Sequence, residues 1–237
     1  MLIKPFVFVV GKKKLKRFAE IETFANVIQP NDRYPVEDHS FKGNWNLLYF
    51  KNQHPIVLEI GCGKGEYTVA LARKFPNVNF IGVDIKGERL WKGARQSLVE
   101  GISNATFLRI QAERLNYFFD HNEISGIWIT FPDPQPRQSR EKKRLTSPKF
   151  LERYRRILAS GSPIHLKTDN TELFEYTLEV ISELDLQLIY HTRDLYEKGN
   201  VDEPLIKETQ THYESIYRAE GIPIKYLRFS LNSRKNG

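Results

Sequence analysis

From residue 56 onward, short apolar runs alternate with segments of helical periodicity. Runs rich in β-branched and apolar residues stand at 56–60, 78–85, 105–110, 124–130, 162–168, 186–191 and 224–231. Continuous apolar runs of this kind are typical of strands in a parallel sheet that is covered on both faces. Because strands that alternate with helices form open sheets with right-handed crossovers, the pattern predicts an α/β fold. We expect a seven-stranded, mostly parallel sheet with helices on both faces.

The N-terminal part of the chain lacks this alternation. We therefore expect a basic N-terminal extension over residues 1–50 and the α/β domain over residues 51–237. Within the domain, one predicted helix has clear boundaries: Ser147 can cap it, Pro148 suits its first turn and Gly161 stops it. A chain of 237 residues fits a single domain of this class.

Composition excludes several classes of protein. The single cysteine, Cys62, cannot form an internal disulfide and fits a reducing compartment. Apolar runs stay well short of the roughly 20 residues that a membrane helix needs, and the first cations follow the apolar start, the wrong order for a signal peptide. We expect a cytoplasmic protein without a membrane partner. The spacing of His, Cys and Asp matches no metal site, so no metal is predicted.

Positive charge is concentrated in two segments. Of the net charge of +7, residues 1–17 carry +6 and residues 137–156 carry +7, so the rest of the chain sums to −6. Two basic segments on an acidic body are typical of proteins that bind polyanions, although each run alone is equally compatible with a solvated surface. The distribution favours a nucleic acid as partner.

A glycine-rich turn follows the first predicted strand. In "VLEIGCGKGEYTVALARKF" the turn glycines are Gly61, Gly63 and Gly65, and an amphipathic helix follows. Glycine permits a tight turn and lets a ligand approach the backbone closely. Asp84 ends the second strand, 19 residues after Gly65, where a carboxylate can accept both hydroxyls of a ribose. Glu59 ends the first strand and is expected to face the same crevice.

Two cofactor types use such a layout, nicotinamide dinucleotides and S-adenosylmethionine. A dinucleotide places its pyrophosphate at the helix N-terminus, usually with G-x-G-x-x-G spacing. Here the third glycine comes one residue early, and the acidic Glu66 opens the helix. S-adenosylmethionine has a zwitterionic methionine part and a positive sulfonium, so it tolerates nearby acids better than a pyrophosphate does. It is therefore the favoured cofactor.

The stretch "GIWITFPDPQPRQSREKKRLTSPKF" joins a predicted strand end to a dense basic loop. Asp133 stands between two prolines, and five cations follow it: Arg137, Arg140, Lys142, Lys143 and Arg144. Such cations can grip phosphates and orient an RNA without reading its sequence. Asp133 is therefore the candidate catalytic residue, and a turn aspartate without a catalytic role is the alternative.

These motifs resemble the bacterial tRNA (guanine-N7)-methyltransferases, which modify guanosine 46 in the variable loop. The resemblance covers about residues 37–230 and rests on "FKGNWNLLY" (41–49), "LEIGCGKGEYTVALA" (58–72), "FPDPQPRQSREKKRLTSPKFL" (131–151), "IHLKTDN" (164–170) and "TQTHYES" (209–215). It implies a Rossmann-like class I methyltransferase fold, S-adenosylmethionine as cofactor and tRNA as substrate.

The resemblance also implies residue roles. Asp133 matches the active-site aspartate; because N7 of guanine carries a free lone pair, Asp133 would position the base and not deprotonate it. The implied cofactor-binding residues are Glu59, Gly61, Gly63, Gly65, Asp84, Gln111 and Asp133. The implied substrate-binding residues are Arg137, Asp169, Thr211, His212, Tyr213 and Glu214. A helix cap is an equal alternative for Asp169, and His165 and Cys62 are expected to be packing residues.

The chain departs from the family pattern at four places. Gln135 replaces an aromatic residue after "PDP", Ser139–Arg140 stand where an Arg–His pair is usual, and Ile216 replaces a basic residue; Gln111 stands where Asp or Asn is usual. A non-enzymatic RNA-binding protein, a methyltransferase acting on a small molecule or a protein, and a nicotinamide oxidoreductase remain as alternatives. The sequence leaves open whether the protein is a monomer or a homodimer and which tRNAs it accepts.

Overall fold

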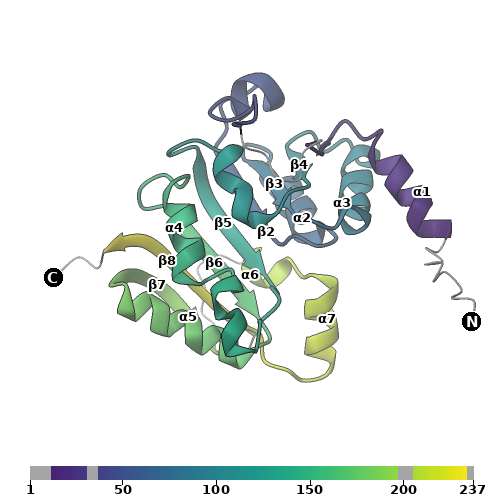
Figure 1. Ribbon diagram of the computed structural model, residues 1–237. Helices are drawn as coiled ribbons and strands as arrows, with labels where there is room; N and C mark the ends of the chain where they lie inside the picture. Colours follow the sequence, from purple (N-terminus) through teal and green to yellow (C-terminus); the bar gives the residue numbers. More distant parts are fainter. Residues whose placement is uncertain (1–11, 31–36, 197–204, 234–237) are drawn as a thin grey trace, which may run out of the picture.

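The computed structural model describes residues 12–30, 37–196 and 205–233. These residues form a sheet of eight strands in the order β1-β4-β3-β2-β5-β6-β8-β7 (Figure 1). Seven of the strands match the predicted runs, and the eighth is a two-residue strand that is too short to give a sequence pattern. The strands are β1 (Val27–Ile28), β2 (Ile56–Ile60), β3 (Asn79–Val83), β4 (Ala105–Leu108), β5 (Ile124–Thr130), β6 (Pro163–Thr168), β7 (Leu186–Thr192) and β8 (Lys225–Ser233).

The six neighbouring strands β1, β4, β3, β2, β5 and β6 are parallel to one another. The exception is β8, which pairs antiparallel with both β6 and β7. The prediction of a mostly parallel sheet is therefore confirmed. In a parallel sheet the carboxyl ends of the strands meet at one edge, and ligands bind there at the point where the strand order reverses. In this sheet that point lies between β2 and β5, because the chain proceeds outward in opposite directions from these two strands.

Helices cover both faces of the sheet. Right-handed crossovers place α2 and α3 on one face and α4 and α5 on the other, and Figure 1 shows the two pairs on different sides, with α1 outside α3. The helices are α1 (Lys12–Ile21), α2 (Glu66–Lys74), α3 (Gly87–Val99), α4 (Pro148–Arg155), α5 (Thr171–Glu183), α6 (Leu205–Glu208) and α7 (His212–Ala219); the shorter turns are η1 (Trp45–Phe50), η2 (Ala112–Tyr117) and η3 (Gln138–Lys143).

Neither Ser147 nor Asp169, the two side chains considered as helix caps, caps its helix. Pro148 does open α4, but the Ser147 hydroxyl donates to the Lys142 carbonyl (3.3 Å) and does not cap the helix. At α5 the cap is Asn170, whose side-chain oxygen accepts from the Leu173 amide (2.7 Å), and not Asp169. In both helices, the preceding turn determines which side chain is directed at the unpaired amides of the first helical turn and can cap them.

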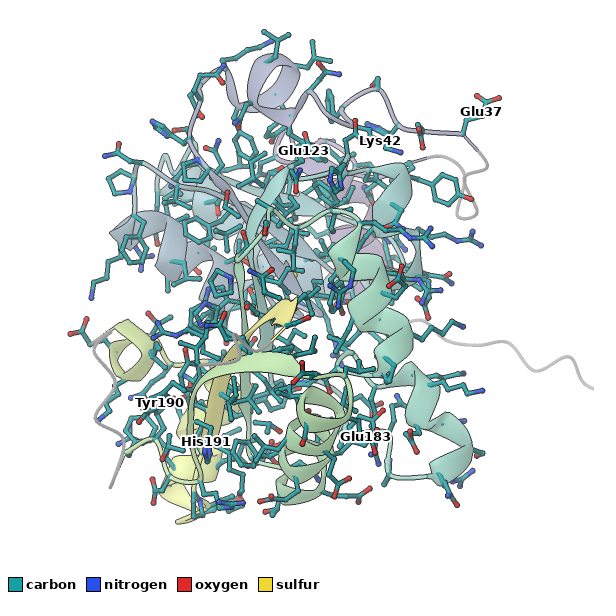
Figure 2. The ribbon with its side chains drawn as sticks, turned by 90° about the vertical axis from the view of Figure 1, so that its left-hand side faces the viewer. Glu37, Lys42, Glu123, Glu183, Tyr190 and His191 are labelled. Carbon is teal, nitrogen blue, oxygen red and sulfur yellow. The ribbon has the colours of Figure 1, made fainter. Side chains whose placement is uncertain are left out.

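Residues before the first predicted strand contribute to the core. Trp45 is fully buried, and its indole nitrogen donates to the Phe118 carbonyl (2.8 Å). Glu123 accepts hydrogen bonds from the backbone amides of Gly43 (2.9 Å) and Trp45 (3.3 Å). Figure 2 shows Glu123 and Lys42 together at one end of the molecule, and Tyr190 and His191 of β7 at the other. The division of the chain at residue 50 stays a prediction.

The described ranges contain neither a membrane-spanning helix nor a cluster of metal-ligating side chains. No helix there has both the length and the apolar character needed to cross a membrane. No cluster of three or more His, Cys, Asp or Glu side chains in the same ranges is arranged to hold a metal ion.

Candidate functional site

The turn between β2 and α2 has a left-handed backbone at each of its three glycines. The φ angles are +76° at Gly61, +56° at Gly63 and +68° at Gly65, a region that side chains with a Cβ rarely adopt. A Cβ on Gly65 would lie 2.3 Å from the Phe107 ring, whereas a Cβ on Gly63 would meet no atom within 4 Å. Gly65 is therefore required for packing, and Gly63 leaves open space beside the backbone.

Asp84 lies directly beside this turn. One oxygen of its carboxylate accepts from the Gly63 amide (2.9 Å) and the other from the Lys86 amide (2.8 Å). The side chain also lines a cleft of about 330 Å³ at the carboxyl ends of the strands. The cleft is lined by Ile60, Gly61, Val83, Asp84, Ile85, Ile110, Gln111, Ala112, Glu113 and Leu145. Gln111 thus lines the same cleft as Asp84, and most of the other lining residues are apolar; the contact of Gln111 with a cofactor stays a prediction.

A smaller cavity of about 70 Å³ adjoins the cleft at Gly61, which lines both. Its walls come from the glycine turn, from the end of β5 and from the start of α7. They are formed by Gly61, Cys62, Gly63, Lys64, Glu66, Tyr67, Arg89, Thr130, Phe131, Thr211 and Tyr213. The structure therefore brings Thr211 and Tyr213 to the glycine turn, although about 150 residues separate them in the sequence.

Glu59 lies beneath the glycine turn and is only 3% exposed. Its carboxylate accepts from the Thr68 amide (2.8 Å) and from the hydroxyls of Thr68 (2.5 Å) and Thr130 (2.6 Å). Burial raises the pKa of Glu59 to about 7, although the threonine hydrogen bonds act in the opposite direction. Glu59 thus ties β2 to α2 and β5; it does not line either cavity, and its contact with a cofactor stays a prediction.

Asp133 lies on the loop that follows β5, and its side chain is exposed. Its carboxylate accepts from the Gln135 amide (3.0 Å). Phe131 and Gln135, on either side of it, both have φ of +47°, a strained conformation for residues other than glycine that persists only where the surroundings hold it. Phe131 lines the small cavity and Leu145 lines the large one, so the loop begins and ends at the site.

Most of the cations of the basic loop are exposed. Arg137 precedes η3, and Arg140, Lys142 and Lys143 lie within it, all of them accessible. Arg144 differs, because it is 5% exposed and its guanidinium pairs with Glu172 (2.5 Å). The prediction that all five cations grip phosphates is therefore wrong for Arg144 in this conformation.

The Thr-x-x-Glu segment forms the start of α7. The Glu214 amide donates to the Thr211 hydroxyl (3.1 Å) and the Thr211 amide to the Glu214 carboxylate (3.4 Å), which is a reciprocal capping box. Tyr213 is 45% exposed and lies under the Lys64 ammonium, 5.8 Å from its ring centre. The side chain of His212 lies outside the described part of the chain. The structure thus aims Thr211 and Tyr213 at the site, whereas Glu214 points into the protein.

Glu214 forms a fully buried ion pair with Lys167 of β6. The two side chains are 2.7 Å apart and both are 0% exposed. The Lys167 ammonium also donates to the carbonyls of Ile206 (2.8 Å) and Thr209 (3.2 Å), and the Tyr196 hydroxyl donates to Glu214 (2.8 Å). The sequence patterns did not predict this pair. The available signal was a lysine inside an otherwise apolar strand.

The remaining predicted residues have simple surroundings. The Asp169 carbonyl accepts from the Lys225 ammonium (2.9 Å), and this residue lines neither cavity. His165 stacks on Trp128 with ring centres 3.9 Å apart, and burial lowers its pKa to about 3. Cys62 is buried within an apolar cluster. The expectation that His165 is a packing residue is confirmed, whereas Cys62 packs in this cluster and also lines the smaller cavity.

Comparison with known proteins assigns the fold. The crystal structure of the 16S rRNA methyltransferase KamB superposes with a TM-score of 0.60 at 16% identity and covers 82% of this chain and 94% of its own. The structure of an antibiotic-related methyltransferase gives 0.59 at 16% identity, with 84% and 96% covered. A family model described as "Putative methyltransferase" matches residues 53–227. The fold and the glycine-turn cleft define a Rossmann-like class I methyltransferase.

Relatives with higher identity narrow the class to one family. A tRNA (guanine-N(7)-)-methyltransferase of Christiangramia forsetii is 49% identical over 223 residues, 93% of this chain and 99% of its own. Another, from Bacteroides fragilis, is 46% identical over 223 residues, 94% of this chain and 87% of its own. The chain belongs to the tRNA (guanine-N7)-methyltransferase family.

Proposed function

We propose that the protein transfers a methyl group from S-adenosylmethionine to N7 of guanosine 46 in the variable loop of tRNA, in the cytoplasm. The observation that carries the proposal is the path of the loop from Phe131 to Leu145. This loop bears Asp133 and the exposed cations, and its two ends line the two cavities beside the glycine turn. One edge of the sheet thus combines a cofactor-sized cleft, an acid and a surface for RNA phosphates.

The cleft fits S-adenosylmethionine better than a dinucleotide. Gly63 leaves open space for close approach of a ligand, but its amide already donates to Asp84, so it is not free for a phosphate. Glu66 adds an acid in the first turn of α2, which disfavours a pyrophosphate there. Asp84 and Gln111 would hold the ribose and adenine in the cleft of about 330 Å³, and Gly61 and Gly63 would adjoin the methionine part in the smaller cavity.

When bound, S-adenosylmethionine supplies an electrophilic methyl group on a sulfonium centre. The protein needs no general base, because N7 of guanine is unprotonated at neutral pH. Its main task is orientation, which can contribute roughly 7–11 kcal/mol to lowering a barrier. Asp133 would accept hydrogen bonds from N1–H and the amino group of guanine, which selects guanine over adenine. Its negative charge would also stabilise the purine as it becomes cationic.

The proposed RNA contacts lie around this centre. Arg137, with the cations of η3, would bind phosphates next to Asp133, and Asp169 would contact the nucleotide from the β6 end. Within α7, Thr211 and Tyr213 stand at the smaller cavity, and His212 and Glu214 complete the predicted segment. Because Glu214 is fully buried against Lys167, its role would be to hold this segment against the site.

Methyl transfer from labelled S-adenosylmethionine to unmodified tRNA tests the proposal. The product is mapped by chain cleavage at 7-methylguanosine, and a matched transcript carries adenosine at position 46. The expected result is label at that single position and none in the substituted transcript. Label in both transcripts would refute the assignment of guanosine 46. Absence of label from both transcripts, with cofactor binding measured by calorimetry, would refute tRNA as the substrate.

A further inference from the structure

Arg144 is the last cation of the basic loop, and its side chain turns back into the protein. Its Nε donates to the Pro134 carbonyl (3.2 Å), and its Nη2 donates to the Glu172 carboxylate (2.5 Å). The guanidinium carbon lies 4.3 Å from the ring centre of Tyr176. Only 6% of the Arg144 side chain is exposed. Its planar guanidinium contacts Pro134, Glu172 and Tyr176 at the same time, which the ammonium group of a lysine cannot do.

These contacts close the basic loop on itself. Pro134 directly follows Asp133, and Arg144 follows η3, so the hydrogen bond from Arg144 to Pro134 joins the two ends of the segment that carries the exposed cations. Glu172 and Tyr176 belong to α5, so the same side chain fixes this closed loop to a helix packed on the sheet. The Arg144 side chain thus links the end of η3 to the residue next to Asp133.

The Asp133 turn needs such support. Phe131 and Gln135 both hold φ of +47°, and strain of this kind persists only where several contacts determine the backbone. On one side, the Phe131 amide donates to the Lys167 carbonyl (2.8 Å). On the other side, the Pro134 carbonyl accepts from Arg144. Arg144 therefore restrains the half of the turn that follows Asp133.

We propose that Arg144 is a positioning residue for methyl transfer: it holds Asp133 in place and couples it to the phosphate-binding loop. This inference rests on the proposed function, because it assigns Asp133 the task of orienting guanine. Arg144 acts through Asp133 and does not touch the RNA. A direct phosphate contact would require its buried guanidinium to leave Glu172, Tyr176 and Pro134.

The test compares Arg144→Gln with Arg140→Gln, a matched change at an exposed position of the same loop. For Arg144→Gln we expect kcat to fall about 10- to 100-fold, since a displacement of the reacting groups by about 1 Å can cost roughly that factor. The Kd values for tRNA and S-adenosylmethionine stay within about 3-fold of wild type. For Arg140→Gln the main effect is on binding, with a higher Kd for tRNA and a smaller salt dependence. Arg144→Lys recovers only part of the lost kcat.

Two further measurements decide between positioning and other roles. On an Asp133→Asn background, Arg144→Gln should lower kcat by less than about 2-fold, because residues that act as one unit are not additive. An undiminished loss on that background, or a reduced salt dependence of tRNA binding, would overturn the proposal. Hydrogen exchange at Gln135 in the free protein should quicken in Arg144→Gln and not in Arg140→Gln.

Hydrogen exchange separates this inference from the proposed function. If wild type methylates no tRNA, the proposed function fails, and unchanged exchange at Gln135 would show independently that Arg144 does not hold the turn. If Arg144→Gln does not fold, Glu172→Ala replaces it, since that change removes one partner of the guanidinium at an exposed position of α5. Faster exchange at Gln135 and a lower kcat are again expected, and exchange at the wild-type rate would overturn the proposal.

Discussion

Glu214→Gln tests the most deeply buried charge pair in the described structure. The change leaves the Lys167 ammonium at 0% exposure with two carbonyl acceptors, Ile206 and Thr209, and without a carboxylate. Removing one partner of a buried ion pair typically costs about 3–5 kcal/mol, because the remaining charge is neither solvated nor compensated. For a chain of this size, that loss corresponds to a fall in Tm of roughly 6–20 °C.

The assay is urea unfolding followed by circular dichroism, with Glu208→Gln as the control. Glu208 pairs with Lys74, but the two side chains are 59% and 45% exposed, so its loss should cost at most about 1 kcal/mol. Adding Lys167→Met to Glu214→Gln removes the stranded charge and should restore part of the stability. If Glu214→Gln costs no more than Glu208→Gln, the ion pair does not hold α7 and the reasoning is refuted.

Three further predictions follow from burial and backbone geometry. Burial raises the pKa of Glu59 from 4.5 to about 7, so the stabilising contribution of Glu59 is complete below pH 4.5 and is lost as the pH rises through about 7. Glu59→Gln should remove this part of the pH dependence of the unfolding free energy. An unchanged pH profile in the variant would contradict the prediction. Gly65→Ala forces a Cβ against Phe107 and should lower the unfolding free energy by more than about 2 kcal/mol. Gly63→Ala meets only backbone strain and should lower it by about 1–2 kcal/mol. Equal losses of stability in thermal unfolding would exclude the packing argument. Trp45→Ala should cost about 3–5 kcal/mol if residues 37–50 belong to the folded core, and a loss below about 1 kcal/mol in urea unfolding would support a separable extension.

The periodic parts of the chain could be predicted from the sequence. Strands such as 56–60 and 124–130 are recognisable because each is a continuous apolar run, and the helix from Pro148 to Arg155 because an apolar stripe follows a proline in its first turn. By contrast, β1 has two residues and no period, so nothing in the sequence marks it as part of the sheet. The cap at Asn170 in place of Asp169 depends on a turn geometry that either residue can adopt.

Local stereochemistry determined the arrangement around the glycine turn, because a glycine turn after a strand and an acid at the next strand end are constrained over a short distance. Gly61, Gly63 and Asp84 therefore lie together as predicted. The charge pairs were decided only by the tertiary structure. Whether Arg144 meets a phosphate or Glu172, and whether Lys167 ends a strand or meets Glu214, depends on helices that pack from elsewhere in the chain. The sequence does not distinguish a charged side chain that is exposed to water from one that is buried. Packing determines the solvation of the charge, and the solvation determines its role.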